Sequence, residues 1–183
     1  DWYSVFVAIE NCSSDVEISL ISTSNDKYKD ISAVGGLIGK STTDYIYQCS
    51  SSGNIETNNS WNVAGFIGNT YASKIDQCYS TGNVKAGSSA AGFIDHFNSA
   101  TGNEKMGVTN SYSTGNVTCD ESYDFSPCTL FINTVGDDIS NNYATGTVTN
   151  RSTNKKRFNK YSSPLVQENN YCSTDEINEE KSE

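Results

Sequence analysis

The chain has 183 residues, of which 22 are acidic and 12 are basic, giving a formal net charge of −10. This length suits one domain, and the acidic balance argues against nucleic acids and anionic membrane surfaces as partners. No apolar run in the sequence approaches the ~18 residues of a membrane-spanning helix.

Two short blocks alternate along the chain. The glycine block occurs at residues 34–39, 63–68 and 90–95, with a weaker copy at 128–133. The tyrosine block occurs at 48–55, 77–84, 110–117 and 141–148, and its copy at 77–84 reads Gln-Cys-Tyr-Ser-Thr-Gly-Asn-Val. Repetition at a step of about thirty residues is typical of a repeat architecture, in which each unit buries its apolar face against its neighbours.

Each repeat predicts several short strands and no helix. Apolar residues alternate over short stretches, and Gly, Asn and Ser interrupt every few residues. We therefore expect an all-β protein, a parallel β-helix or β-solenoid of about five to six coils. In chain order, the coils are expected around residues 1–33, 34–62, 63–89, 90–127, 128–163 and 164–174. An acidic tail or linker is expected at 175–183.

Stacked coils place equivalent residues of successive repeats in columns. The first position of the tyrosine block is an amide in six copies, which predicts a hydrogen-bonded structural ladder along the axis. These residues are Asn11, Gln48, Gln77, Asn110, Asn141 and Asn169. The expected interior columns are Ile9, Ile46, Ile75, Val108 and Ile139, and Ile18, Ile55, Val84, Val117 and Val148. Gly53, Gly82, Gly115 and Gly146 are expected to supply a corner with positive φ.

Two positions after the amide, four consecutive copies carry a tyrosine: Tyr79, Tyr112, Tyr143 and Tyr171. This column predicts a stacked aromatic row. Ring packing within the solenoid wall is the first interpretation. The alternative is a binding site on which the flat faces of sugars stack.

The cysteines divide into two sets. Cys12, Cys49 and Cys78 share one column, where free thiols serve as small apolar fillers. Cys119 and Cys128 bracket an insertion and are a candidate disulfide, which would agree with an oxidising compartment. Sequons that permit N-glycosylation in a eukaryotic source begin at Asn11, Asn58, Asn116 and Asn150.

Gly36-Leu37-Ile38-Gly39 and Gly65-Phe66-Ile67-Gly68, each followed by a tyrosine block, resemble the GLUG repeat, which is named for a Gly-Leu-any-Gly core. The resemblance covers residues 9–150 and extends faintly to 174. It departs at Asp95, at 130–133 and at Val16, which replaces the corner glycine. It implies a right-handed β-helix segment of a large secreted or surface protein. GLUG repeats occur in bacterial adhesin-like and immunoglobulin-A-peptidase-type proteins, usually beside other domains and without chemistry of their own.

The residue types that carry chemistry are scattered. His96 is the only histidine, so no zinc-protease motif and no Ser-His-Asp set is expected, and a surface or turn position is the simplest interpretation. The candidate carboxylates of a polysaccharide hydrolase or lyase occupy different columns and should not converge on one groove. They are Asp44, Asp76, Asp95 and Asp137-Asp138.

Two further clusters have ordinary interpretations. The acids at 120–124 and 137–138 lack the glycine spacing of a calcium loop, so solvated surface acids are expected there. The basic cluster at 155–160 predicts a solvated loop, with an acidic partner or a glycan as the alternative. No enzymatic activity, no metal and no cofactor are therefore expected.

Together these features favour a non-catalytic structural or adhesive repeat module, extracellular or at a cell surface. The expected partners are other protein domains or further copies of the chain, joined through the solenoid ends into fibres. A glycan-binding module that uses the tyrosine row is the first alternative, and a carbohydrate-active β-helix enzyme is the second. Neither nucleic-acid binding nor membrane insertion is expected.

Overall fold

The computed structural model describes residues 7–23, 32–43, 45–71, 74–98, 107–119, 128–135, 138–150, 157–162 and 167–172. Within these ranges the chain forms short strands and no helix, as the sequence predicts. A search of the same residues finds no helix long and apolar enough to cross a membrane.

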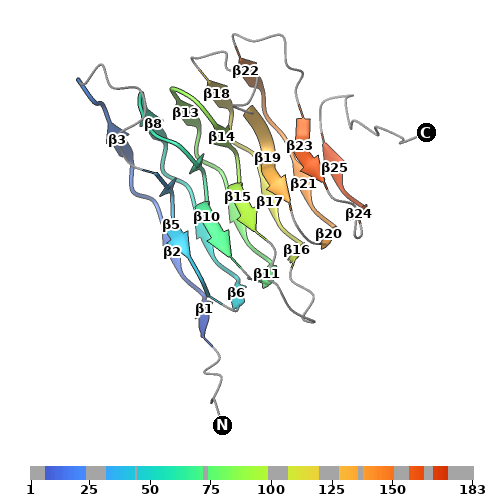
Figure 1. Ribbon diagram of the computed structural model, residues 1–183. Helices are drawn as coiled ribbons and strands as arrows, with labels where there is room; N and C mark the ends of the chain where they lie inside the picture. Colours follow the sequence, from blue (N-terminus) through green and yellow to red (C-terminus); the bar gives the residue numbers. More distant parts are fainter. Residues whose placement is uncertain are drawn as a thin grey trace.

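Four parallel sheets form the walls of a β-solenoid (Figure 1). Sheet A stacks β1 (Ala8–Glu10), β6 (Tyr45–Tyr47), β11 (Lys74–Asp76), β16 (Gly107–Thr109), β20 (Asp138–Ser140) and β24 (Gln167–Glu168). Sheet B stacks β2 (Ser13–Ser14), β7 (Ser50–Ser51), β12 (Tyr79–Ser80), β17 (Tyr112–Ser113), β21 (Tyr143–Ala144) and β25 (Tyr171–Cys172).

The other two walls follow the same order. Sheet C stacks β3 (Ile18–Leu20), β8 (Ile55–Thr57), β13 (Val84–Ala86), β18 (Val117–Cys119) and β22 (Val148–Asn150). Sheet D contains β4 (Val34–Gly35), β5 (Ile38–Ser41), β9 (Val63–Ala64), β10 (Ile67–Tyr71), β14 (Ala90–Ala91), β15 (Ile94–Asn98) and β19 (Cys128–Val135), with β23 (Arg157–Ser162) paired to β19. Each coil therefore passes through sheets D, A, B and C before the chain returns to sheet D.

The structure supports a solenoid of about three turns, which is fewer than the five to six coils expected from the sequence. Three passages through all four sheets are interrupted by no more than two undescribed positions: 34–57, 63–86 and 128–150. The other passages contribute strands to the sheets, but longer undescribed segments divide them. The expected tail at 175–183 lies outside the described residues.

The core consists of columns of identical or similar apolar side chains. Ile46, Ile75, Val108 and Ile139 of sheet A are fully buried, and Ile55, Val84, Val117 and Val148 of sheet C are buried in the same core. This confirms both predicted interior columns, although Ile9 and Ile18 in the first coil are only partly buried. Phe66, Phe93 and Phe131 stack in parallel at centroid distances of 4.8 and 4.9 Å. Burying each ring stabilises the fold by roughly 1.5–3 kcal/mol.

The corner glycines do not have the conformation that we expected. Of the four, only Gly146 has a positive φ, of 122°. A Cβ on Gly82 would lie 2.0 Å from the carbonyl oxygen of Gly53, and one on Gly115 would lie 1.9 Å from that of Gly82. Glycine is required there because the backbones of successive coils approach too closely for any side chain.

The left-handed conformation instead falls on the amide ladder. All six of its residues have φ between 50° and 56°, and Asn62 is the only other non-glycine residue with positive φ in the described chain. Asparagine tolerates this region better than most residues, because its short side chain can hydrogen-bond locally. The turn from sheet A to sheet B is therefore made by the amide, immediately before the tyrosine column.

Candidate functional site

The four predicted tyrosines lie on the outer face of sheet B, one above another. β12, β17, β21 and β25 pair in register, so that Tyr79 lies beside Tyr112, Tyr112 beside Tyr143 and Tyr143 beside Tyr171. The rings of Tyr79 and Tyr112 are 4.9 Å apart at 3°, and those of Tyr112 and Tyr143 are 4.7 Å apart at 7°. The row follows from the parallel register, because identical residues recur at the strand spacing.

The stacking limits what the row can bind. Both faces of Tyr112 are occupied by its neighbours, and burial together with the phenols of Tyr143 and Tyr79 raises the pKa of its hydroxyl. Tyr79, Tyr143 and Tyr171 are exposed, at 37%, 40% and 61% of their surface. The row therefore presents ring edges and hydroxyl groups to solvent along most of its length, and ring faces mainly at its ends.

The amide ladder runs along the corner beside this row. Gln48 Nε2 donates to Gln77 Oε1 at 3.2 Å, Asn141 Nδ2 to Asn110 Oδ1 at 3.4 Å, and Asn169 Nδ2 to Asn141 Oδ1 at 3.1 Å. At the middle step Asn110 donates to Asp76 Oδ1 at 2.7 Å. The side chain of Asp76 thus replaces that of Gln77 as the acceptor at this step.

The column that follows the amides forms a second, inward ladder that the sequence analysis missed. Each backbone N–H in it donates to the side chain of the next coil: Cys12 to Cys49, Cys49 to Cys78, Cys78 to Ser111, Ser111 to Asn142 and Asn142 to Asn170. The side chains then donate to inward carbonyls, as Cys78 Sγ does to the oxygen of Asp76 at 3.3 Å. The side chains of this column share the ability to form hydrogen bonds. The replacement of Cys by Ser and then by Asn along the column was the sequence signal for this ladder.

Two thiols of this column, those of Cys49 and Cys78, are buried. Burial raises the pKa of Cys49, and it raises the pKa of Cys78 to about 12. Cys12, Cys49 and Cys78 are free thiols, and Cys12 is the exposed member of the column. Buried thiols with a raised pKa are poor nucleophiles, so they serve here as packing and hydrogen-bonding groups.

A third ladder lines the turn between sheets B and C. Asn54 Oδ1 accepts from the backbone N–H of Asn83 at 2.9 Å, Asn83 Oδ1 from Asn116 at 3.0 Å, and Asn116 Oδ1 from Thr147 at 2.9 Å. One of the predicted sequon residues, Asn116, is therefore part of the scaffold.

The other sequon residues have different environments. The side chain of Asn58 exchanges two hydrogen bonds with the backbone of Ser22, both at 2.8 Å. Asn11 is exposed on the amide corner, and Asn150 ends β22.

The candidate carboxylates that the structure describes lie in different columns of the repeat. Asp76 lies in β11 of sheet A and accepts from Thr109 Oγ1 and Asn110 Nδ2, both at 2.7 Å. Asp138 lies in β20 of the same sheet, in the column of Lys74 and Gly107. Asp95 points into the solenoid from β15, where it is 2% exposed, so it is not a carboxylate on a solvent-facing sheet.

The remaining candidates are placed as follows. His96 lies within β15, in register with Asn69 and Thr134, so it occupies a strand and not a turn. Asp44, Asp137, the acids at 120–124 and the basic residues Lys155 and Lys156 lie outside the described residues. Arg157 and Lys160 lie in β23, so the prediction of a loop is wrong for this part of the basic cluster. Among the residues that are described, no three His, Cys, Asp or Glu side chains come together in a group that could hold a metal ion.

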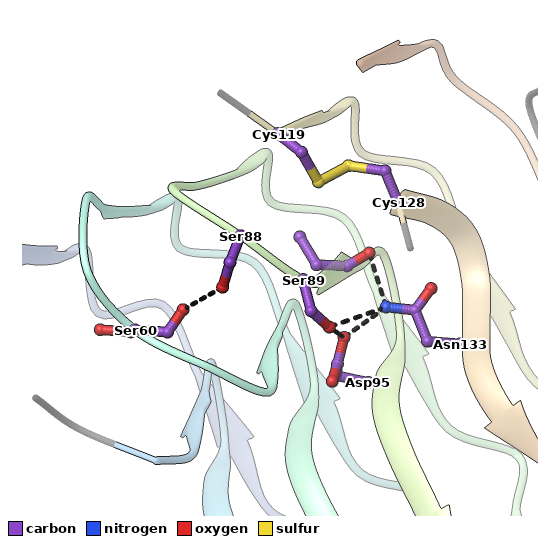
Figure 2. Close-up of a disulfide and its surroundings, with 8 residues drawn as sticks. Ser60, Ser88, Ser89, Asp95, Cys119, Cys128 and Asn133 are labelled. Carbon is purple, nitrogen blue, oxygen red and sulfur yellow. Dashed lines mark hydrogen bonds between the residues drawn. A yellow bond between two sulfur atoms is a disulfide. The ribbon is translucent and has the colours of Figure 1, made fainter. Parts of the chain in front are cut away.

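A buried polar cluster and a disulfide occupy the corner between sheets C and D (Figure 2). Cys119 at the end of β18 is bonded to Cys128 at the start of β19, with their Cα atoms 6.2 Å apart. Nearby, Ser89, Asp95 and Asn133 point toward one another and share hydrogen bonds. Burial raises the pKa of Asp95 to about 7, against the opposing effect of these hydrogen bonds. Burial therefore favours the neutral form of this carboxyl group relative to that of an exposed aspartate.

The two blocks of the repeat meet inside the solenoid. Ser51 Oγ of sheet B donates to the carbonyl oxygen of Gly65, and Ser80 Oγ donates to that of Gly92, at 2.5 and 2.6 Å. A Cβ on Gly65 would lie 2.2 Å from the Gly92 oxygen and 3.2 Å from the Cβ of Ser80. Glycine is thus required at position 65, because the backbone of the next coil and the serine of the tyrosine block leave no room for a side chain.

The comparison with protein families agrees with this geometry. The GLUG motif matches residues 59–85, which span β9 to β13 and contain one complete passage through the four sheets. No curated protein and no solved structure matches the chain. Residues 59–85 are therefore a GLUG motif, a β-helix repeat, within this parallel β-solenoid.

Proposed function

We propose that the chain is a non-catalytic structural repeat module, a rigid spacer or adhesive segment of an extracellular or cell-surface protein. The observation that supports this proposal most is the set of three side-chain ladders, which link coil to coil on top of the backbone pairing. Such ladders stiffen a solenoid along its axis, which a spacer requires and a flexible linker lacks. The disulfide between Cys119 and Cys128 supports an oxidising compartment.

The same proposal includes a right-handed solenoid of five to six coils and contacts between copies through its ends. Within the described residues, β1, β2 and β3 end sheets A, B and C, each with one hydrogen-bonded neighbour. Open strand edges of this kind pair readily with another chain. Stacking of one solenoid on the next would continue each ladder across the junction and produce fibres.

A single substitution in β1 tests whether copies of the chain associate through this open edge. In β1, Asn11 N–H donates to Tyr47 and Val7 C=O accepts from Tyr45, so the N–H groups of Ala8 and Glu10 face away from β6. Replacing Glu10→Pro removes one outward donor and leaves this pairing in place. We expect the native chain to form concentration-dependent rods in light scattering and electron microscopy, and Glu10→Pro to prevent them while Glu10→Ala does not. A discrete monomer at every concentration would exclude the fibre.

Glycan binding along the tyrosine row is the second candidate function. The exposed ring edges and hydroxyls of Tyr79, Tyr143 and Tyr171 support it. Loss of signal on a glycan array for Tyr112→Ala and Tyr143→Ala is expected if the row is the site. Tyr71→Ala is the matched control, because Tyr71 is similarly exposed, at 40%, on sheet D. Binding that survives both row variants would remove this function.

A carbohydrate-active enzyme is the least favoured function. Asp76 and Asp138 lie in different columns of sheet A, and Asp95 is buried, so the described acids do not form a facing pair. Turnover of polysaccharides that is lost in Asp76→Ala would overturn the proposal of a non-catalytic module.

A further inference from the structure

Ser89, Asp95 and Asn133 form a closed group of reactive atoms inside the solenoid (Figure 2). β15 and β19 pair Ile94 with Ile132 and His96 with Thr134, which places Asp95 directly beside Asn133 of the next coil. Ser89 immediately precedes β14. Its Oγ donates to Asp95 Oδ1 at 2.5 Å, and Asn133 Nδ2 donates to the same carboxylate oxygen.

A single carboxylate oxygen thus touches a hydroxyl group and an amide nitrogen at once. Asn133 Nδ2 also lies 3.3 Å from Ser89 Oγ and 3.0 Å from the carbonyl oxygen of Ala90. Because the amide C–N bond is about 1.33 Å long, the amide carbon lies within ~4.7 Å of the serine oxygen. The reaction requires these two atoms to approach to the ~3–3.5 Å of a reactive arrangement.

We propose that Ser89 and Asn133 become joined by an ester bond between neighbouring coils, with Asp95 as the acid–base catalyst. Asp95 takes the proton from Ser89 Oγ as this oxygen attacks Cγ of Asn133. The Cγ–Nδ2 bond then breaks, and Asp95 returns the proton to the departing nitrogen, which leaves as ammonia. The balance is one hydroxyl and one amide converted into one ester and one ammonia, with no change in oxidation state.

The surroundings fit this reaction. Ser89, Asp95 and Asn133 are 9%, 2% and 1% exposed, so that water competes poorly with the serine and the product ester is shielded from hydrolysis. Burial holds the pKa of Asp95 at about 7, close to the value at which a group exchanges protons in both directions at neutral pH. The two earlier glycine blocks have Gly39 and Gly68 at the position of Asp95, so only this corner has the catalyst.

The mass of the folded native chain tests the proposal. After reduction of the disulfide, we expect the intact mass to be lower than that of the sequence by about 17 Da, the mass of ammonia. Trypsin cuts after Lys85, Lys105 and Arg151, so Ser89 and Asn133 fall in the fragments 86–105 and 106–151. The ester should hold these two fragments together, and hydroxylamine should release them. An unchanged mass, or a loss of ammonia with separate fragments, would overturn the proposal.

Variants separate the catalyst from the reacting groups. Ser89→Ala should restore the full mass, and Asp95→Asn should abolish or greatly slow the loss of ammonia in chains that fold. Ser88→Ala is the matched control, because Ser88 Oγ donates to the carbonyl oxygen of Ser60 at 3.0 Å and is outside the cluster. This variant should form the link as the native chain does. Formation of the link in Ser89→Ala would also overturn the assignment.

Discussion

The coils at residues 34–86 and those at 90–133 differ in how they pack the last position of the glycine block. In the first region Gly68 ends the glycine block, and a Cβ there would lie 2.6 Å from the carbonyl oxygen of Asn62. In the second region Asp95 and Asn133 hold the equivalent position, and their side chains fill the corner with hydrogen bonds beside a disulfide. The packing of the first region depends on the absence of a side chain at Gly68. The packing of the second region depends on the protonation of Asp95 and on the oxidation of Cys119 and Cys128.

The largest loss of stability should come from adding one side-chain carbon, at Gly65, in the first region. Gly65→Ala places a Cβ 2.2 Å from the backbone oxygen of Gly92, which cannot move without parting two coils. We expect a loss of about 4–5 kcal/mol in the free energy of unfolding, measured with denaturant.

Gly39→Ala is the matched control for this variant. Its Cβ would lie 3.1 Å from one backbone oxygen, so we expect a loss of about 1 kcal/mol. Equal losses in the two variants would show that the close stacking of coils does not determine the glycine.

The second region should respond to pH. The pKa of Asp95 is raised to about 7 in the folded chain from an ordinary value of 3.8, so the folded state binds the proton more tightly than the unfolded state. The resulting stability is fully present below pH ~4 and is lost as the pH rises through ~7, by at most about 4 kcal/mol.

Denaturant unfolding of the native chain and of Asp95→Asn across this range isolates the contribution, because the other acids titrate in both. The native chain should lose stability relative to Asp95→Asn as the pH rises. A constant difference between the two would show that the carboxyl group is not held in its neutral form.

The disulfide should contribute less. Cys119 and Cys128 are nine residues apart, and closing so short a loop stabilises a fold by about 2–3 kcal/mol in the chain-entropy description. Reductant should lower the unfolding midpoint of the native chain and leave a Cys119→Ser, Cys128→Ser double variant unchanged. A native chain that is insensitive to reductant would show that the polar cluster alone maintains this corner.

The smallest effect should come from the tyrosine row, which spans both regions. The ring of Tyr112 stacks on those of Tyr79 and Tyr143, whereas the ring of Tyr79 stacks on that of Tyr112. Replacement by Leu should cost about 1–2 kcal/mol at Tyr112 and about half as much at Tyr79, since each aromatic pair is worth roughly 0.5–1.5 kcal/mol. Equal losses measured by denaturant unfolding would attribute the effect to burial and not to stacking.

Much of the fold could be predicted because its signals are local and repeated. The interior columns through Ile46 and Ile55 and the stacked row through Tyr112 followed from aligning the blocks. The positive φ was assigned to the wrong column, because both glycine and asparagine adopt it and the sequence does not give the distance between coils. Gly82 is fixed by an oxygen of the previous coil, 29 residues away.

The buried cluster could not be predicted for a related reason. Asp95 is visible in the sequence as a departure from the glycine block, but an isolated acid is usually solvated. Its burial depends on Asn133, which lies 38 residues later and becomes its neighbour only through the pairing of β15 with β19. A pair of polar substitutions at the same position in successive glycine blocks is the signal that would have identified it.

The inward ladder gives the solenoid a polarity. From Cys12 to Asn142, the acceptor for each backbone donor belongs to the coil on the carboxyl-terminal side. Within this ladder, shortening the protein from its amino-terminal side removes one donor and leaves every remaining donor with its acceptor. Shortening it from the other side deprives a buried N–H of its acceptor, at a cost of about 1–3 kcal/mol. Within this ladder, the cost of an unpaired buried donor therefore arises only at the carboxyl-terminal end.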